Sequence, residues 1–316
     1  MAPTFLVVGA TGNTGQSVVE TLSSELKNSS AFSNYSILAQ TRSASSATAQ
    51  RLAKLPNVSI VEKPWIEITP EWLREHEVSR AFVASHNEPV QFAEESSFLV
   101  AALRAGVEYV VRISTTAANV RADCDAYYPR THWAIEAMLS SPEFKALQWT
   151  SLQPNVFTTF WLAPAAGLVK NYRETGKQET LRLMASEDAP VGVVEPSDVG
   201  GFAARLLLTK DVQKHNGAKY VMNGPEDITG KQVVEMVEKA IGEPVKDVVF
   251  KDMSFLDAYV EAEGRKDVKT VMRSIAYAPV TAWEGKCTAS TTSKEVLEIA
   301  PPKHSPTAVF EALLKE

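Results

Sequence analysis

The sequence predicts an α/β fold, with a doubly wound parallel Rossmann sheet followed by a smaller, mostly helical C-terminal substrate lobe. Apolar segments of strand length alternate with helical segments through the first half of the 316 residues, an order typical of parallel sheets covered by helices. A glycine-rich turn also joins the first apolar segment, residues 5–8, directly to a helical one. We place a Rossmann domain at residues 1–155 and the substrate lobe at 156–316, with parts near 190–223 returning to the Rossmann domain.

Each expected element follows from the spacing of its apolar residues. In the first half, strands are expected at residues 5–8, 35–40, 58–61, 81–84, 107–113 and 149–153, and helices at 47–55, 70–76 and 92–105, with Gly106 as a C-cap and a further helix that has Pro129 in its first turn. In the second half, strands are expected at 180–184, 190–194 and 219–222, and helices at 197–208, 230–241, 254–263, 266–275 and 307–314.

The glycine turn is the first candidate site. Glycine lets the backbone approach a ligand closely, and the free N–H groups of the helix N-terminus that follows favour an anion. The spacing carries one more residue between its first two glycines than the Gly-x-Gly-x-x-Gly fingerprint, and the pattern alone also suits a tight turn in any α/β protein. We expect a phosphate cradle formed by Gly9, Thr11, Gly12, Asn13, Thr14 and Gly15.

The end of the second strand decides between NAD and NADP. An NAD site normally places an acidic residue there, whereas an arginine can bind the 2′-phosphate of NADP. Residues 26–61 contain no Asp or Glu, and the strand ends at Thr41, Arg42 and Ser43. We therefore expect NADP(H), with these three residues at its adenosine ribose; the bland alternative is that Arg42 is only a surface arginine.

Polar residues also follow the fourth and fifth strands. Ser85 and His86 come after residues 81–84, and Ser114 comes after residues 107–113. Ligands of doubly wound sheets bind outside the carboxyl ends of the strands, so we expect these side chains beside the cofactor. For His86, a plain surface loop is an equal alternative.

Composition excludes several classes of protein. The net charge of −6 and the absence of a dense Lys/Arg run argue against direct nucleic-acid binding. Cys124 and Cys287 are the only cysteines, too few for a disulfide framework or a zinc site, and we expect no metal. No apolar run reaches the length of a membrane span, and the apolar N-terminus is interpreted as a core strand and not a signal peptide, so a cytoplasmic protein is expected.

The chain resembles the NmrA-like group of atypical short-chain dehydrogenase/reductases. The resemblance is carried by residues 9–15, by Thr41-Arg42 and Ser114, and by the segments 132–136, 153–157, 195–200 and 220–226. It implies an NADP-binding Rossmann domain with a smaller lobe over the nicotinamide, and it adds Pro154, Asn155 and Phe157 to the cofactor site. Some relatives reduce quinones, enones, imines or phenylpropanoid compounds, and others bind the dinucleotide without evident turnover and act on regulatory partners.

The catalytic chemistry departs from that of typical short-chain dehydrogenases. Those enzymes pair a Tyr with a Lys four residues on, and here Tyr128 is followed at that spacing by His132. Pro129 disfavours helical backbone at Tyr128, so the two side chains need not share a face. His132 can donate or hold a proton near neutral pH, or it can pair with Glu136 instead. We take Tyr128, His132 and Ser114 as catalytic candidates, with His132 also a candidate for contacting the cofactor.

Aromatic residues beyond the sixth strand predict an apolar substrate pocket, formed by Phe157, Phe160, Trp161 and Met184, although any one of them also suits a core position. The favoured function is an NADPH-dependent reductase acting on a C=O, C=C or C=N bond of a small hydrophobic substrate, aromatic or a natural product. The alternative is a non-catalytic NADP(H) sensor that binds a protein partner, and a homodimer also stays open. A nucleotide-sugar epimerase is disfavoured because the Tyr-x-x-x-Lys pair is missing.

Overall fold

A seven-stranded parallel sheet forms the centre of the molecule in the computed structural model, which describes residues 2–315. Its strand order is β3-β2-β1-β4-β5-β6-β8, so the order reverses at β1, between β2 and β4. The strands are β1 (Thr4–Val8), β2 (Ser36–Thr41), β3 (Val58–Glu62), β4 (Val78–Val83), β5 (Tyr109–Ile113), β6 (Gln148–Pro154) and β8 (Ala218–Met222). This is the doubly wound Rossmann arrangement expected from the sequence, and its ligand site lies at the reversal.

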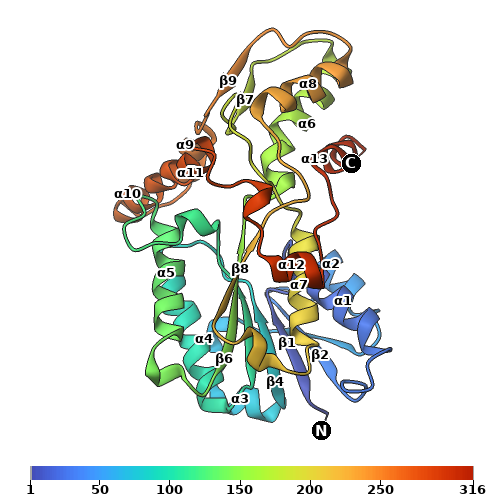
Figure 1. Cartoon of the computed structure of the whole chain (residues 1–316), viewed down its shortest axis with the longest axis vertical. Helices are drawn as coiled ribbons and strands as arrows, with labels where there is room; N and C mark the ends of the chain where they lie inside the picture. Colours follow the sequence, from blue (N-terminus) through green and yellow to red (C-terminus); the bar gives the residue numbers. More distant parts are fainter. Residues whose placement is uncertain (1, 316) are drawn as a thin grey trace.

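Helices cover both faces of this sheet, as Figure 1 shows. One face carries α1 (Gly15–Leu26), α2 (Ala47–Leu52) and α7 (Pro196–Leu207), and the other carries α3 (Pro70–Glu75), α4 (Gln91–Ala105) and α5 (Tyr127–Leu139). Because side chains alternate along a strand, Phe5 and Val7 of β1 pack into the first core, while Leu6 and Val8 pack into the second. Gly106 has a φ of 80° and ends α4 as the expected C-cap.

The C-terminal part of the chain adds a second layer of structure above the sheet (Figure 1). It contains α6 (Thr158–Thr175), α8 (Gly230–Ile241) and α13 (Pro306–Leu313), with a parallel pair of strands, β7 (Leu181–Leu183) and β9 (Val248–Phe250). The α7 helix and β8 return to the sheet, where β8 pairs with β6. The prediction of a strand at 190–194 is wrong, because only isolated bridges at Val191 and Val194 form there.

A smaller group of helices packs on the N-terminus of α5. It contains α9 (Phe255–Glu261) and α10 (Lys266–Met272), and their side chains Leu256, Val260 and Met272 form a cluster with Tyr127. The helices α11 (Val280–Trp283) and α12 (Lys294–Ile299) follow. Short 3-10 helices occur at η1 (Trp65–Glu67), η2 (Ala117–Asn119), η3 (Pro142–Phe144), η4 (Val212–His215), η5 (Arg273–Tyr277) and η6 (Ala289–Thr291).

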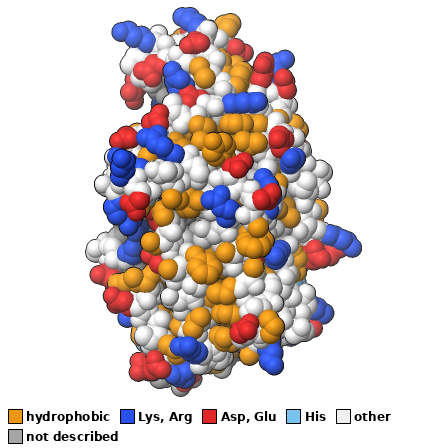
Figure 2. Space-filling view, turned by 90° about the vertical axis from the view of Figure 1, so that its left-hand side faces the viewer, with side chains coloured by type: hydrophobic (Ala, Val, Ile, Leu, Met, Phe, Trp, Pro, Cys, Tyr) orange, Lys and Arg blue, Asp and Glu red, His pale blue; other side chains and the backbone are white. Residues whose placement is uncertain are grey.

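The surface mixes charged and apolar side chains. Figure 2 views the side of the molecule that carries α5, α9 and α10, where hydrophobic side chains form a broken band bordered by charges of both signs. Exposed large hydrophobic residues of the molecule include Phe92 of α4 and Trp133 of α5. Within residues 2–315, every helix is too short or too polar to cross a membrane.

Candidate dinucleotide cleft and active site

A cleft of about 1340 Å³ runs along the carboxyl ends of β1, β2, β4, β5 and β6. It brings together most of the side chains that the sequence analysis proposed: Gly9, Thr11, Gly12, Asn13, Thr14, Gly15, Thr41, Arg42, Ser85, His86, Ser114, Tyr128, His132, Pro154, Asn155, Phe157 and Phe160. Ser43, Trp161 and Met184 do not line it. In residues 2–315 no group of three or more His, Cys, Asp or Glu side chains could hold a metal ion.

The glycine turn is shaped for close approach of a ligand to its backbone. Gly9 has a φ of 75°, and its N–H donates to Oε1 of Gln40 at 2.9 Å, which fixes the turn against β2. A Cβ atom on Gly15 would lie 2.1 Å from the carbonyl oxygen of Gly9, so only glycine fits where α1 begins. Thr14 stands at the N-cap without a side-chain capping bond, so its side chain does not cover the N-terminus of α1, where an anion is favoured, although the Gln16 N–H already donates to the carbonyl oxygen of Gly12 at 3.2 Å.

Arg42 lies at the end of β2 on the rim of the cleft. Its side chain is exposed and, within the described part of the chain, has no hydrogen bond or ion pair. The hydroxyl of the neighbouring Thr41 is buried and bonds to that of Thr11 at 3.1 Å, so Thr41 shapes the turn instead of facing solvent. Ser43 points away, with its hydroxyl 3.0 Å from that of Ser45.

Three further residues that were not expected from the sequence line the cleft near the end of β2. Lys63, Trp65 and Ile66 follow β3 and line the cleft beside Arg42. The sequence contains little indication of a role for these residues, because a lysine or an exposed aromatic residue after a strand is common on any surface.

A buried ionic network lies beneath the cleft and is centred on Arg112 of β5. Arg112 is fully buried and forms an ion pair with the equally buried Glu95 of α4. Its Nη1 donates to the Ser151 hydroxyl at 2.9 Å, and that hydroxyl donates to Glu136 at 2.7 Å. Lys219 of β8 completes the network with an ion pair of 3.1 Å to Glu136. A buried charge is tolerated only when it is paired in this way.

His132 is held neutral by this network. Nη2 of Arg112 donates to Nδ1 of His132 at 2.7 Å, and a guanidinium can only donate, so Nδ1 carries no proton. The other nitrogen, Nε2, then carries the hydrogen; it donates to Oδ1 of Asn87 at 3.1 Å and also lies 3.3 Å from the side-chain amide of Gln91. Burial and the charge of Arg112 hold the pKa of His132 well below its usual value of 6.5. The lowered pKa favours a neutral imidazole near neutral pH, and within residues 2–315 His132 bonds to Arg112 and Asn87 and not to Glu136; its catalytic role stays a prediction.

Tyr128 shares a helical face with His132, contrary to the expectation from Pro129. The α5 helix begins at Tyr127, so Pro129 sits within the first turn, where its missing N–H costs nothing. The rings of Tyr128 and His132 meet edge-to-face with centroids 6.5 Å apart. Burial raises the pKa of Tyr128 to about 12, although a hydrogen bond with Thr115 opposes the shift.

Two hydroxyls at neighbouring strand ends have different surroundings. Ser85 is occupied, because it donates to Glu95 at 2.6 Å and accepts from Gln91 at 2.9 Å. Ser114 is buried and lines the cleft, yet its Oγ has no hydrogen-bond partner within the described chain. A buried hydroxyl without a partner is costly, so the Ser114 hydroxyl is suited to a bound ligand.

Beyond β6, the residues divide between the cleft and the core. Phe157 and Phe160 line the cleft, and Phe160 meets Phe255 of α9 edge-on at 5.7 Å. Trp161 is only 4% exposed and, like Met184, packs with the C-terminal core, so neither forms the expected pocket wall. Trp161 directly follows Phe160 on α6, and successive helical residues point about 100° apart, so Trp161 faces the core while Phe160 faces the cleft.

Asn155 lines the cleft but is occupied by the protein itself. Its amide nitrogen lies within 3.2 Å of the carbonyl oxygens of Gly192 and Cys287 and of Oδ1 of Asn223. Its own Oδ1 accepts from the backbone of Val156 at 2.8 Å. The side chain of Asn155 therefore ties β6 to the C-terminal segment, and little of it is free for a cofactor.

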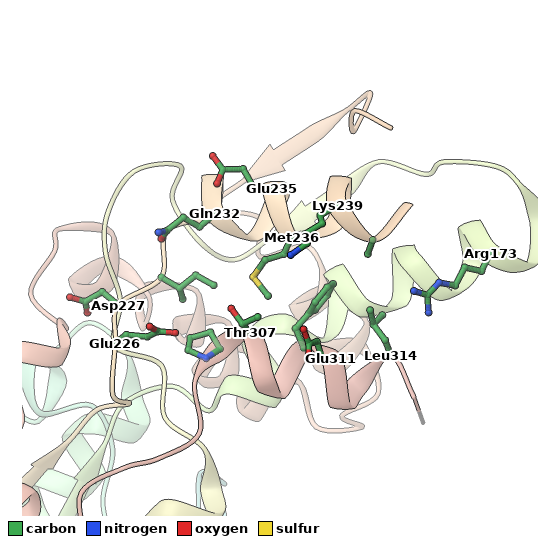
Figure 3. A pocket seen from close by; sticks show the side chains of 14 residues that line it. Arg173, Glu226, Asp227, Gln232, Glu235, Met236, Lys239, Thr307, Glu311 and Leu314 are labelled. Carbon is green, nitrogen blue, oxygen red and sulfur yellow. The ribbon is translucent and has the colours of Figure 1, made fainter. Parts of the chain in front are cut away.

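A second cavity, of about 570 Å³, lies between α8 and α13 (Figure 3). Its floor is apolar, with Met236 and Leu314, and its rim carries charges of both signs, including Arg173 and Lys239. None of the site residues expected from the sequence lines it, and it shares no lining residue with the first cleft.

The strand order and the glycine turn at β1 define the class of the protein: a Rossmann-fold protein with a cleft of dinucleotide-binding type. The unpaired arginine at the end of β2 fits the same class. The chain belongs to the NmrA-like family, whose model matches residues 1–275.

Solved structures share this fold over nearly the whole chain. The NADPH complex of the NADPH-dependent quinone oxidoreductase QOR2 from Escherichia coli has a TM-score of 0.72 at 20% identity, covering 98% of this chain and 99% of that one. The NADP(H) complex of triphenylmethane reductase from Citrobacter has a TM-score of 0.66 at 19% identity, covering 98% and 100%. The negative transcriptional regulator NmrA, in complex with NAD, has a TM-score of 0.68 at 14% identity, covering 99% and 96%.

One curated relative is similar in sequence over part of its length. It is the (4-alkanoyl-5-oxo-2,5-dihydrofuran-3-yl)methyl phosphate reductase of Streptomyces griseus, 27% identical over 160 residues. The match spans about half of each protein, 51% of this chain and 51% of that reductase.

Proposed function

We propose that this protein is an NADPH-dependent reductase of a C=O, C=C or C=N bond in a small hydrophobic substrate. The observation that carries the proposal is the unpartnered Ser114 hydroxyl, buried in the same cleft as the glycine cradle and the unpaired Arg42. In this arrangement Arg42 binds the 2′-phosphate, the glycine turn binds the pyrophosphate, and the nicotinamide lies toward Ser114 and Phe157. The named activities of the quinone oxidoreductase and the two other reductases support this reading.

The residues of the cleft would supply position, exclusion of water and a proton. NADPH supplies the hydride when it is bound. Phe157 and Phe160 form apolar walls that exclude water from the reacting atoms. Tyr128 keeps its phenolic proton at neutral pH, because its pKa is raised to about 12, and it can therefore donate a hydrogen bond or a proton to a substrate oxygen. His132 holds Asn87 in place at the end of β4 and does not act as the acid.

The proposal is tested by measuring oxidation of NADPH by the purified full-length protein across quinones, enones and imines. We expect turnover with at least one hydrophobic acceptor, and loss of NADPH affinity in Arg42→Ala. Arg173→Ala removes an arginine outside the cleft and serves as the matched control. Tight NADPH binding without oxidation by any acceptor would reject the reductase function.

The alternative function is a non-catalytic NADP(H) sensor that binds a regulatory protein. One observation favours it: the pKa of His132 is lowered well below its usual value, so the residue four positions after Tyr128 lacks the positive charge that a Lys would supply there. A sensor would bind a protein partner only when NADP(H) is present, and this binding would survive His132→Ala. Turnover with a hydrophobic acceptor, together with partner binding that ignores NADP(H), would exclude the sensor.

A further inference from the structure

We infer that the substrate end of the cleft accepts an uncharged or cationic aromatic molecule and disfavours an anionic one. This inference rests on the proposed reductase function, because it concerns the acceptor of the same site. It follows from where the formal charges of the cleft lie.

The cations of the cleft lie on its adenosine side. Arg42 follows β2 and Lys63 follows β3, whereas the substrate end lies beyond β4. Glu94 also faces the adenosine side, because Phe98, one turn further along α4, packs against Trp65 with ring centroids 6.2 Å apart. Of the described residues that line the substrate end, Glu88 is therefore the one with a formal charge.

Glu88 stands close to the aromatic groups of the substrate end. The preceding residue, Asn87, accepts a hydrogen bond from the phenol of Tyr127 at its backbone oxygen. Burial raises the pKa of Tyr259 on α9, and the charge of Glu88 raises it further. Glu88 thus directly follows the residue that binds the Tyr127 phenol, and its charge raises the pKa of both Tyr127 and Tyr259. Tyr259 lies on α9, whose Phe255 meets Phe160.

Among residues 2–315, the buried groups beneath this end of the cleft supply no free positive charge to this carboxylate. His132 is neutral, and Arg112 beneath it is already paired with Glu95 and lies 3.7 Å from Glu136. A phosphate or sulfonate in this end of the cleft would meet aromatic rings and one carboxylate, without a cation to bind it. An aromatic acceptor that is neutral or positively charged would instead pack against Phe157 and Phe160.

The curated relative differs on this point, since its name specifies a phosphate ester as the substrate. The share of that protein covered by the match is too small to transfer its substrate. The charges that line the cleft predict instead that this protein disfavours an anionic substrate.

The test uses 1,4-naphthoquinone and 1,4-naphthoquinone-2-sulfonate with the full-length protein. We expect Glu88→Lys to raise kcat/KM for the sulfonate about tenfold, while kcat/KM for the neutral quinone changes about twofold or less. Glu75→Lys, which makes the same charge change on the exposed end of α3, controls for net charge and leaves the ratio of the two unchanged. An unchanged ratio in Glu88→Lys would overturn the inference.

Measurements of quinone binding test this inference independently of the proposed reductase activity. Calorimetric titration of both quinones into the NADP⁺-loaded protein measures their affinities whether or not they are reduced. We expect weaker binding of the sulfonate to the natural protein and a gain in Glu88→Lys. If neither quinone oxidises NADPH but the affinities follow the charge, quinone reduction fails and the inference stands; equal affinities in both proteins would overturn the inference alone.

Discussion

Arg112 donates a hydrogen bond of 2.7 Å to Nδ1 of His132 from a position fully buried beneath the cleft. The bond fixes both the tautomer and the charge of the imidazole, because a guanidinium does not accept a proton in return. His132, a catalytic candidate because histidine so often transfers protons, is thus a neutral hydrogen-bond donor to Asn87.

The first prediction is that His132 stays neutral at the pH where a free histidine titrates, because a proton on Nδ1 would face the Nη2–H donor of Arg112. Nitrogen NMR of the ring atoms should show the Nε2–H tautomer throughout. The chain has five histidines, so His132→Gln assigns the signal by its loss. A ring that titrates like free histidine would contradict the proposed tautomer.

The lowered pKa of His132 also makes the free energy of unfolding fall as the pH is lowered. The pKa of His132 is lowered in the folded protein, so below about pH 6.5 the unfolded chain binds the proton more readily. Its stabilising contribution is complete above that pH and is lost as the pH falls, by at most about 1.4 kcal/mol per pH unit. Urea titrations should show this slope, and His132→Gln should show a smaller one.

Arg42→Ala should weaken NADPH binding about ten- to a hundredfold and NADH binding much less, because only NADPH carries the 2′-phosphate. Calorimetry with both cofactors measures the difference. Equal losses for the two cofactors would reject the 2′-phosphate role of Arg42.

Gly15→Ala should destabilise the protein by about 1–3 kcal/mol and abolish dinucleotide binding, because the new Cβ would lie 2.1 Å from the carbonyl oxygen of Gly9. Gly167→Ala is the matched control: no atom lies within 4 Å of its added Cβ, and alanine favours a helix interior. Thermal unfolding and NADPH titration of both variants measure the contrast. Tight binding by Gly15→Ala would show that the turn is not the cradle.

Tyr128→Phe should lower kcat about a hundredfold or more while the Kd for NADPH changes little, because the phenol is proposed to give a proton and not to hold the cofactor. Tyr172→Phe, near the C-terminal end of α6, removes a phenol that does not line the cleft and should leave kcat unchanged. A parallel loss of kcat and cofactor affinity in Tyr128→Phe would indicate a structural role instead.

The strand ends and the glycine turn were predictable because their signals are local. The strand and helix that flank Gly9 to Gly15 follow from apolar spacing, and the reversal at β1 follows from alternating elements. The expectation that Pro129 keeps Tyr128 out of the helix was wrong, because a proline in the first turn does not prevent the residue before it from being helical.

The ionic network was not predicted, although β5 carried a signal for it. An arginine within the apolar run 107–113 must find a buried anion, but the run does not say which one. Glu95 lies on α4 and Glu136 on α5, and only tertiary packing brings them to Arg112. The prediction that Trp161 lines the pocket was wrong for the same reason, because the face that α6 buries depends on the elements that pack against it.

The amide of Asn155 bonds to segments that lie 37, 68 and 132 residues away along the chain. The sheet and the C-terminal segment thus share one cluster of hydrogen bonds, and separating them would strand several polar groups at once. This coupling predicts that the two parts unfold together: we expect one calorimetric transition for both, and Asn155→Ala to split it into two.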